Sequence, residues 1–598
     1  MTPAEVAYRV SQKALQRRER KAFADRVPVH AVKAYGDVPS VDLSRLGLNH
    51  ANDDFTTGSD IELLGPYTYA DYKTCWHAAF KAGGEWPVKF AHDYNFGEEG
   101  VPGDIRTNWE LNRHYQFTLL AKSFFATGDS AYLDELGSLF ASWNDANPFM
   151  WGPEWASPME SAIRLVNWLV AACFLESAQA ADERSRALAA DLCSGAYVMA
   201  ANVCRHYSRY SSANNHTIVE ASGVAIAAVV FGQEAWLDEA LALLGREVAL
   251  QTWPDGVNKE QALHYQLFVM EALCLVSHVL RASGSELPEP IVDALRRMAH
   301  YAAACRVGEQ TCIEFGDDDE GIVFNPCGRK PFYSGYVLAL ASLEVGTDVR
   351  WSDELGSYEQ LRWLFSPGDV ERVSNLPLFR PARVETFPQG GVTIARVADD
   401  RVVLAFDHGP LGFGALAAHG HADALSVQLY VDGRAVLVDS GTYVYNGNRA
   451  MRDLFRSTAM HNAVCVGGRN QSEDLGPFLW GRKASVSGFS LDDSDGALTL
   501  SAFHDGYSPA THKRTIVLDD SILRIVDEVD SDAADAFASF HLSANGSAPG
   551  ISLAFSSPEE RREFEYSPAY GRLAKGTEIM VQFKGRLTTE IHFDKEAL

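Results

Sequence analysis

Three short segments of the sequence gather the side chains that could carry out chemistry. In the first, SSANNHTIVEASG (211–223), Asn214, Asn215 and His216 come directly before an apolar run with helical spacing. An asparagine at such a position commonly caps the helix, and capping by Asn215 is one reading of the motif. Two amides and an imidazole at a helix N-terminus also form a good receptor for an anion. The segment therefore predicts either a capped helix or an anion-binding site.

The second segment is WPDGVNKEQALHYQLFVMEA (253–272), in which Tyr265 lies inside an otherwise apolar helical run. A tyrosine at helical spacing is more often a core residue whose hydroxyl is hydrogen-bonded. However, Lys259, Glu260 and Gln261 come just before the run and are typical of the polar mouth of a site. The segment therefore predicts either a core tyrosine or a tyrosine near the mouth of a site.

The third segment is HGHADALSVQLYVDGRAVLVDSGTYVYN (419–446), followed by MHNAVCV (460–466). His419 and His421 can converge, because alternate residues of a strand face the same side. Asp439 and His461 follow downstream, and imidazoles with a carboxylate suit zinc. The segment predicts a metal site, with a metal-free structural role for these residues as the alternative.

The elements expected around these segments fall into two classes. Between about residues 60 and 370 the apolar spacing is helical, notably over 111–128, 158–178, 216–232 and 261–284. No sequence repeat of fixed period is present, and the succession of helix hairpins favours an α/α toroid or a solenoid. From about residue 385 the spacing changes to period two, with Asp-Asp and Asp-Gly turns. Nine or more such strands fit an antiparallel sandwich.

These patterns predict a multidomain α+β protein. We expect a mainly α-helical, incomplete (α/α) toroid over residues 1–375 and an antiparallel β-sandwich that carries the metal site over 376–598. The segment SPGDVERVSNLPLFRPARVET (366–386) is richer in proline and polar residues, so we place the linker there.

Composition excludes some classes of protein. Hydrophobic residues make up 46% and charged residues 22%, as in globular proteins and unlike disordered ones. The formal net charge of −27 speaks against a non-specific nucleic-acid binder. An enzyme acting on polyanions would have to gather its cations locally, against this overall charge. The nine cysteines are odd in number and contain no CxxC pair, which favours buried free thiols over a disulfide framework.

The expected surroundings of the protein follow from its apolar runs. No run approaches the roughly 20 residues that span a bilayer, so no membrane partner is expected. The N-terminus alternates charged with apolar residues and lacks the continuous apolar region of a signal peptide. As written, the sequence predicts a cytoplasmic protein. A periplasmic or secreted protein from which the export signal has been removed would look similar. The oligomeric state is left open.

Taken together, the three segments resemble the heparinase II/III-type superfamily of polysaccharide lyases, which includes heparinases and alginate lyases with the same two-domain plan. The similar blocks are roughly 104–170, 214–271 and 387–466, and the combination of HGHADALS, VDSGTY and HNAV is specific. The resemblance implies β-elimination of a uronic-acid-containing glycan to give 4,5-unsaturated products. The glycan would be a glycosaminoglycan such as hyaluronan, chondroitin or heparan sulfate, or alginate. The lack of a signal peptide departs from the secreted members.

The resemblance also implies roles for single residues. Asn215 matches the asparagine that binds the uronate carboxylate, and His216 matches the adjoining active-site histidine. Tyr265 matches the catalytic tyrosine, and His419 matches the second catalytic histidine. The ligands of one structural divalent ion, usually zinc, with manganese or calcium as alternatives, match His421, Asp439 and His461. Further candidates for binding the substrate are Asn214, Lys259, Glu260, Arg449 and Arg452.

The chemistry of β-elimination explains these residue types. Removing H5 of a uronate leaves a dianion-like enolate, so neutralising the carboxylate, here by Asn215 and His216, gives the largest help. Tyrosine has a reference pKa of about 10, and His419 or the nearby arginines would have to lower it. In glucuronate, H5 and O4 share one face, and Tyr265 could act as base and then as acid. In iduronate or guluronate they lie on opposite faces, so a histidine would be the base and Tyr265 the acid.

Two other functions remain open at this point. A glycoside hydrolase on an α/α toroid, acting on an acidic polysaccharide, would need two carboxylates that flank the bond. Glu160, Glu220 and Asp255 are candidates, but no two of them are grouped as the motif residues are. A non-catalytic glycan-binding protein would bind without turnover; the presence of Tyr265 together with both histidines argues against it.

Overall fold

The computed structural model describes residues 3–80, 83–97, 100–346, 348–494, 496–530, 535–544 and 550–594. Contacts divide the chain into two compact units. The first, here called the helical unit, comprises Met1–Leu250, Leu267–Arg296 and Gly321–Leu378. The second, here called the β unit, comprises Gln251–Gln266, Arg297–Glu320 and Phe379–Leu598.

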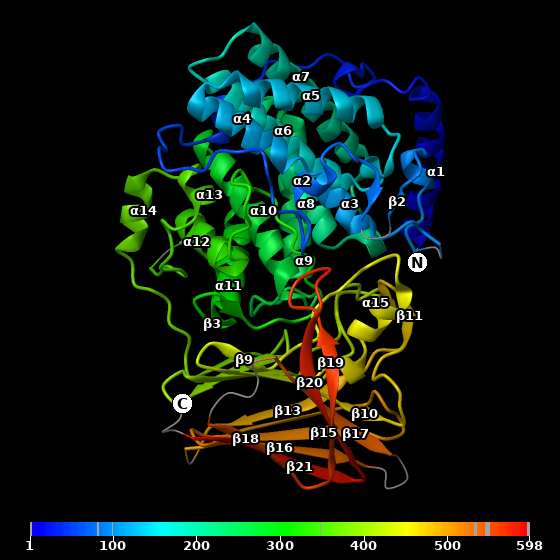
Figure 1. Cartoon of the computed structure of the whole chain (residues 1–598), viewed down its shortest axis with the longest axis vertical. Coiled ribbons are helices and arrows are strands. Elements are labelled where there is room, and N and C mark those ends of the chain that lie inside the picture. Colours follow the sequence, from blue (N-terminus) through cyan, green and yellow to red (C-terminus); the bar gives the residue numbers. More distant parts are fainter. Residues whose placement is uncertain are drawn as a thin grey trace. The chain divides into compact units, whose positions relative to one another are not determined.

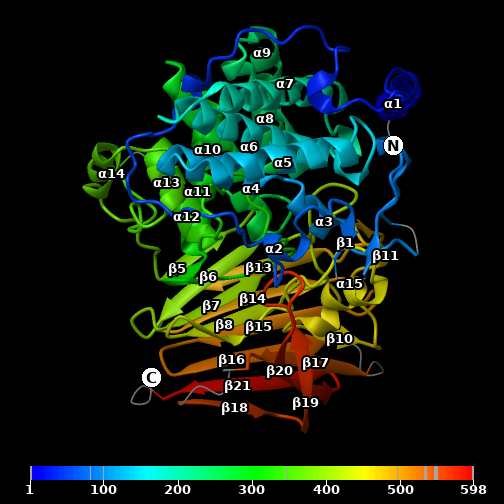
Figure 2. The same ribbon diagram turned by 45° about the horizontal axis from the view of Figure 1, so that its top comes forward.

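The helical unit is built around α6 (Pro158–Ser177), which packs against α4, α7 and α8. Figures 1 and 2 show α4, α5, α6 and α7 side by side. Proline occupies the first turn of α6, where its missing N–H costs nothing, and Trp168 and Leu169 are fully buried at its centre. The other helices in this part of the chain are α1 (Pro3–Ala22), α2 (Tyr69–Tyr72), α3 (Ile105–Leu111), α4 (Tyr115–Thr127), α5 (Ser130–Ala146), α7 (Glu183–His206), α8 (Asn215–Val230), α9 (Glu234–Gln251), α10 (Leu263–Ala282), α11 (Glu289–Ala304), α12 (Tyr333–Val345), α13 (Glu359–Arg362) and α14 (Pro367–Ser374).

Three of these helices correct the expectation that no apolar run reaches membrane-spanning length. By length and hydropathy alone, Pro158–Ser177, Glu183–His206 and Leu263–Ala282 are long and apolar enough to cross a membrane. Within the structure, 94%, 67% and 100% of their apolar windows are buried. The chain's own packing therefore accounts for their hydropathy.

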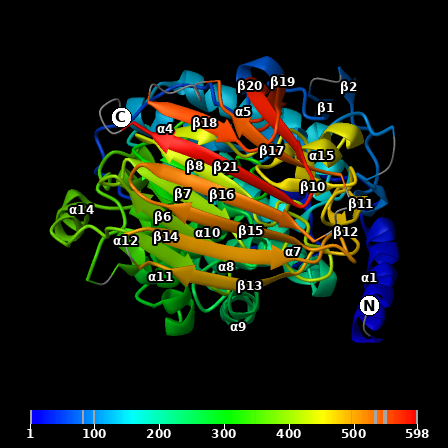
Figure 3. The same ribbon diagram turned by 90° about the horizontal axis from the view of Figure 1, so that it is seen from below.

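The β unit contains two large antiparallel sheets. In the described residues, one sheet has nine strands in the order β19-β20-β17-β9-β8-β7-β6-β5, with β10 also paired to β17. The other has six strands in the order β13-β14-β15-β16-β21-β18. Figure 3 shows the six strands in this order, and Figure 2 shows β5 to β8 side by side. Their bounds are β5 Val384–Phe387, β6 Val392–Val397, β7 Val402–Asp407, β8 Val427–Val431, β9 Arg434–Leu437, β10 Val464–Val466, β13 Val486–Asp492, β14 Leu498–His504, β15 His512–Leu518, β16 Ile522–Val529, β17 Ala536–Leu542, β18 Ile551–Phe555, β19 Glu559–Tyr566, β20 Ala574–Phe583 and β21 Arg586–Phe593.

One apolar core joins the two sheets. Leu404 and Leu429 of the nine-stranded sheet belong to the same buried cluster as Leu500, Ile516 and further residues of the six-stranded sheet. Burial alternates along β14 and β15, as expected for strands with one solvated face. Two sheets that share one core form a sandwich. Around it lie short elements: the hairpins β3 (Arg306–Gly308) with β4 (Thr311–Cys312) and β11 (Asp474–Gly476) with β12 (Leu479–Trp480), and the helix α15 (Arg449–Phe455).

The strands β6, β7 and β8 are buried on both faces, and residues 297–320 cover part of the second face. The guanidinium of Arg396 on β6 donates to the carbonyl oxygen of Ala304 at 2.5 Å. The backbone N–H of Glu314 donates to Gln428 Oε1 on β8 at 3.2 Å. These bonds explain why a segment that interrupts the helices in sequence belongs to the β unit.

The predicted fold class, a helical N-terminal part followed by a C-terminal antiparallel β-sandwich, is confirmed. The sequence places the boundary between residues 375 and 376, whereas the helical unit reaches Leu378 and leaves two earlier segments to the β unit. All nine cysteines are free thiols, as expected. Burial is less general than predicted, because Cys75 is exposed and Cys204 and Cys312 are partly so.

Candidate active site and metal centre

A buried carboxylate that the sequence motifs do not include, Asp317, lies at the centre of a polar cluster in the β unit. His419 Nδ1 lies 3.0 Å from Asp317 Oδ2, and His421 Nε2 lies 3.0 Å from Asp317 Oδ1. The guanidinium of Arg452 donates to both carboxylate oxygens, at 2.5 and 2.7 Å. Burial by itself would raise the pKa of Asp317, but Arg452 and the two histidines hold it well below its usual range. Asp317 is therefore an anion that orients both histidines of His-Gly-His.

Backbone contacts that require glycine bring Asp317 to these histidines. The backbone N–H of Asp317 donates to the carbonyl oxygen of His419 at 2.9 Å. A Cβ on Gly316, whose φ is +62°, would lie 2.7 Å from that same oxygen. A Cβ on Gly420 would lie 1.6 Å from the carbonyl oxygen of Leu411. Glycine is thus needed both beside Asp317 and between the two histidines.

Tyr265, at the start of α10, stacks on His419 with 3.9 Å between ring centroids. Because Asp317 is ionised, His419 Nδ1 donates to it, and Nε2 is the ring nitrogen that faces away from Asp317. The hydroxyls of Tyr265 and Tyr445 are 2.9 Å apart. Burial, followed by the charge of Asp317, raises the pKa of Tyr445 well above its usual range. Tyr445 therefore keeps its proton and can donate to the oxygen of Tyr265, which stabilises that oxygen when it loses its own.

Asp317 and Tyr445 are the two residues of this cluster that the sequence interpretation missed. Asp317 lies in EFGDDDE (314–320), an acidic run about a hundred residues before His419 with no spacing that links the two. Tyr445 lies in GTYVYN, inside the third motif, where a second tyrosine two residues after Tyr443 was a visible but unused signal.

Lys259 and Glu260, the two charged residues before Tyr265 that are predicted to bind substrate, have different surroundings. Glu260 is buried, with Oε2 3.7 Å from His419 Nε2. The Lys259 ammonium lies 4.3 Å from the ring centroid of Trp253, and burial lowers its pKa. Both lie in the β unit, and Glu260 lies beside Nε2 of His419.

The two predicted arginines of α15 differ even more. Arg449 is exposed and its guanidinium pairs with Asp453 and Asp474. Arg452 is buried, and its guanidinium lies 4.8 Å from the ring centroid of Tyr445 while it binds Asp317. Arg452 therefore stabilises the cluster through its ion pair with Asp317.

The predicted metal ligands His421, Asp439 and His461 converge in the β unit. All three are buried, and one donor atom from each lies within 4.8 Å of the other two. His421 Nδ1 and His461 Nε2 are 3.1 Å apart, and Asp439 Oδ2 lies 3.6 Å from His461 Nε2. Two imidazoles and a carboxylate are a donor set that zinc accepts.

The partners of these imidazoles turn their lone pairs toward one another. His461 Nδ1 is 2.8 Å from the carbonyl oxygen of Ser457, which only accepts, so Nδ1 is the donor. His421 Nε2 likewise donates to Asp317. Burial lowers the pKa of His461, which keeps its ring neutral. The facing atoms are then both lone pairs beside a carboxylate, and a cation is the group that satisfies all three. The residues fit a divalent metal ion.

The Asn214, Asn215 and His216 motif lies in the helical unit, at the start of α8. The side chain of Asn214 caps the helix, since its Oδ1 accepts the backbone N–H of His216 at 3.1 Å. This corrects the reading in which Asn215 is the cap, because the helix begins at Asn215 itself. Asn215 is fully buried and His216 is half-buried. Tyr265, His419 and the metal ligands belong to the β unit.

The carboxylates considered for a hydrolase are engaged elsewhere. Glu160 forms a two-pronged ion pair with Arg113, at 2.8 and 2.9 Å. Asp255 accepts three backbone N–H groups of the β unit. Burial raises the pKa of Glu220 to about 8, and it accepts bonds from Ser208. These contacts give each carboxylate a structural role.

Comparison with known protein families matches most of the chain. The family model for the heparinase II/III N-terminus matches residues 69–322, and the model for the heparinase II/III-like C-terminal region matches residues 380–594. The chain belongs to the heparinase II/III-like family.

Two relatives in this family are named heparin-sulfate lyases. The protein from Bacteroides stercoris is 23% identical over 74% of this chain, and that from Bacteroides thetaiotaomicron is 21% identical over 72%. The chain spans 66% of the length of the first relative and 60% of the second.

Solved structures agree on the fold. A heparinase III structure has a TM-score of 0.64 at 16% identity and covers 94% of this chain and 88% of its own. A variant of the heparan sulfate lyase from Pedobacter heparinus has a TM-score of 0.58 at 16% identity and covers 97% of this chain and 88% of its own. At such identities the likeness establishes the shared heparinase fold.

Proposed function

We propose that this protein is a polysaccharide lyase that cleaves a uronate-containing glycosaminoglycan by β-elimination. The relatives named heparin-sulfate lyase make heparin and heparan sulfate the first substrates to try. Hyaluronan, chondroitin and alginate come next. The substrate is thus an acidic polysaccharide, and the product would carry a 4,5-unsaturated uronate.

The observation that carries this proposal is the Tyr265, His419 and Asp317 arrangement. His419, held through Nδ1 by Asp317, stacks on a tyrosine whose hydroxyl has a hydrogen-bonded partner. Elimination requires removal of a proton at C5 and delivery of one to O4, and these two side chains can exchange protons. Hydrolysis would instead require a pair of carboxylates that flank the bond. Glu160 and Asp255 are engaged in structural contacts.

In the proposed reaction each residue has a separate task. Asn215 and His216 neutralise the uronate carboxylate, the role that the family resemblance gives them. Tyr265 takes H5 of a glucuronate and returns the proton to O4. His419, oriented by Asp317, polarises the hydroxyl of Tyr265, and Tyr445 donates to its oxygen. With iduronate, His216 would remove H5 and Tyr265 would protonate O4.

We also propose that His421, Asp439 and His461 hold one divalent ion, zinc first, with manganese or calcium as alternatives. The ion would cross-link the segments that carry its ligands and so fix the loop before β8 that presents His419, two residues from His421. It supplies rigidity; the proton transfers belong to the side chains.

The test is turnover of a panel of glycosaminoglycans, followed through the ultraviolet absorbance of the unsaturated product. Tyr265→Phe should retain less than about a tenth of the wild-type kcat, a loss of at least about 1.4 kcal/mol. The matched control is Tyr430→Phe, which deletes the hydroxyl that donates to Gln428 at 2.8 Å in the same unit. It should cost stability and leave kcat per folded molecule unchanged.

Two results would contradict the proposal. Reducing ends that appear without ultraviolet absorbance would establish hydrolysis. Near-normal turnover by Tyr265→Phe would reduce Tyr265 to a core residue.

A further inference from the structure

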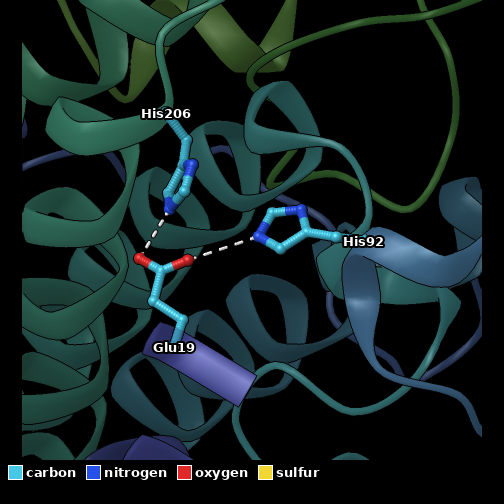
Figure 4. Close-up of side chains that lie close together, drawn as sticks. All are labelled: Glu19, His92 and His206. Carbon is cyan, nitrogen blue, oxygen red and sulfur yellow. Dashed lines mark hydrogen bonds and ion pairs between the residues drawn. The ribbon is translucent and has the colours of Figure 1, made fainter. Parts of the chain in front are cut away.

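A second set of imidazoles around a carboxylate lies in the helical unit, among residues far apart in sequence. Glu19 is on α1, His92 is in the short 3-10 helix η3 (Ala91–Asp93), and His206 ends α7. His206 Nε2 lies 2.8 Å from Glu19 Oε1, and His92 Nε2 lies 3.4 Å from Glu19 Oε2. Figure 4 shows each ring pointing one nitrogen at the carboxylate. One donor atom from each residue lies within 4.8 Å of the other two.

We propose that Glu19, His92 and His206 form a binding site for a divalent metal ion of the zinc type, which fastens α1 to the end of α7. Zinc bonds to nitrogen and oxygen at about 2.0–2.2 Å, so neighbouring ligand atoms of a tetrahedral site are about 3.3 Å apart. The nitrogen–oxygen separations of 2.8 and 3.4 Å lie close to this value. Small movements of the side chains would therefore admit the ion.

Burial and charge in the cluster suit such an ion. Glu19 is 3% exposed and His206 is 8% exposed, while the side chain of His92 is 17% exposed. The last value leaves one side on which water can complete a tetrahedron. The neighbouring charges Arg20 and Asp93 form an ion pair with each other, so they do not neutralise Glu19. A buried carboxylate flanked by two imidazoles gains most from a doubly charged partner.

The site would act on a segment that leads to α8. The first half of α1 contacts this segment directly. The Tyr8 hydroxyl donates to the carbonyl oxygen of Tyr207 at 2.9 Å. Arg9 donates to the hydroxyls of Ser211 and Ser212, at 3.1 and 2.9 Å. His206 begins the segment and Asn214 ends it. An ion on Glu19 and His206 would therefore hold residues 207–213 between two fixed ends.

Zinc titration can isolate this site from the proposed metal centre of the β unit. Both proteins to be compared carry His461→Asn, which removes a ligand of that centre, and both are washed with chelator first. We expect the His461→Asn protein to bind one more Zn²⁺ per chain than the protein that also carries His92→Asn, by calorimetry and elemental analysis. This comparison holds whether or not the β unit binds an ion.

The control for His92→Asn is His30→Asn, a histidine of the helical unit that contacts Asn144 instead. It should leave the Zn²⁺ stoichiometry unchanged. A second readout is hydrogen exchange of peptides from α1 and from residues 207–213, which Zn²⁺ should slow in the protein with His92 and not in the variant. Equal zinc binding with and without His92 would overturn the site, and unchanged exchange would overturn its fastening of α1.

Discussion

The β unit contains two buried aspartates that look alike and have different surroundings. Asp527 accepts from His512 Nε2 at 2.8 Å and from the guanidinium of Arg514 at 2.8 and 3.1 Å. Asp317 holds two histidines and Arg452 in the same manner. Burial tends to raise the pKa of Asp527, but Arg514 and His512 lower it to about 2, so both aspartates are anions.

The difference lies in what else the ring of each histidine contacts. His512 Nδ1 meets His504 Nε2 at 3.1 Å, across the paired strands β14 and β15, and so stays within the sandwich. The ring of His419 instead stacks on Tyr265. An Asp–His–Arg group is therefore a core device in one place and a candidate catalytic device in the other. The candidate catalytic group is identified by the tyrosine on which its histidine stacks.

The largest effect expected from this comparison is that of Asp317→Asn. The amide no longer fixes the His419 proton on Nδ1, and it leaves Arg452 buried without its anion. We expect kcat per folded molecule to fall about a thousandfold or more, the scale of removing the aspartate behind a catalytic histidine. Ultraviolet turnover, corrected for the folded fraction by circular dichroism, measures it.

Asp527→Asn is the matched control for this change. It breaks an equally buried aspartate–arginine pair, so a loss of about 3–5 kcal/mol of stability is expected in both variants. Only Asp317→Asn should slow the chemistry of the folded molecules. Equal kcat in the two variants would show that Asp317, like Asp527, contributes only to stability.

Neighbouring asparagines at the start of α8 extend the comparison to the helical unit. Asn214 serves as the cap, whereas Asn215 is the predicted carboxylate-binding residue. We expect Asn215→Ala to lower kcat about a hundredfold, the scale of one oxyanion-type donor. Asn214→Ala should cost about 1 kcal/mol of stability and leave kcat per folded molecule nearly unchanged.

Steady-state kinetics and a thermal melt on the same two samples separate the roles. A lowered melting temperature with normal kcat in Asn215→Ala would remove Asn215 from the site.

The sequence was sufficient for the fold class, because two hydrophobic periods, helical and then alternating, follow directly from burial. It also predicted the convergence of His421, Asp439 and His461. The reason it gave was wrong, because His419 and His421 lie in the loop before β8 and not on a strand. It could not predict Asp317, which reaches His419 through the backbone bonds of a loop about a hundred residues away. Nor could it predict Glu19 with His92 and His206, whose positions depend on helix packing and follow no local spacing.

It also misassigned the helix cap. Adjacent asparagines are equivalent by type, and the choice between Asn214 and Asn215 depends on where the backbone enters the helix. Residue chemistry is thus visible in a sequence, while the partner of each residue is decided by tertiary contacts.

The smallest expected effect on catalysis is that of Glu220→Gln, and its main effect is on stability. Burial raises the folded-state pKa of Glu220 to about 8, above an unfolded value near 4.5. The folded protein therefore binds a proton that the unfolded chain has lost between these two values, and stability contributed by Glu220 falls as pH rises through this window. Glutamine does not ionise, so the melting temperature of the variant should rise relative to wild type from pH 5 to pH 8 and then level off.

The control is Glu239→Gln, which replaces an exposed carboxylate of α9 and should leave the pH profile unchanged. Because the glutamine oxygen can still accept from Ser208, kcat should change by less than about threefold, or roughly 0.7 kcal/mol. A difference in melting temperature that stays constant across this range would mean that Glu220 is already ionised in the folded protein. The two hydrogen bonds that Ser208 donates to Glu220, at 2.7 and 2.8 Å, would then be charge-assisted and would stabilise the segment before α8.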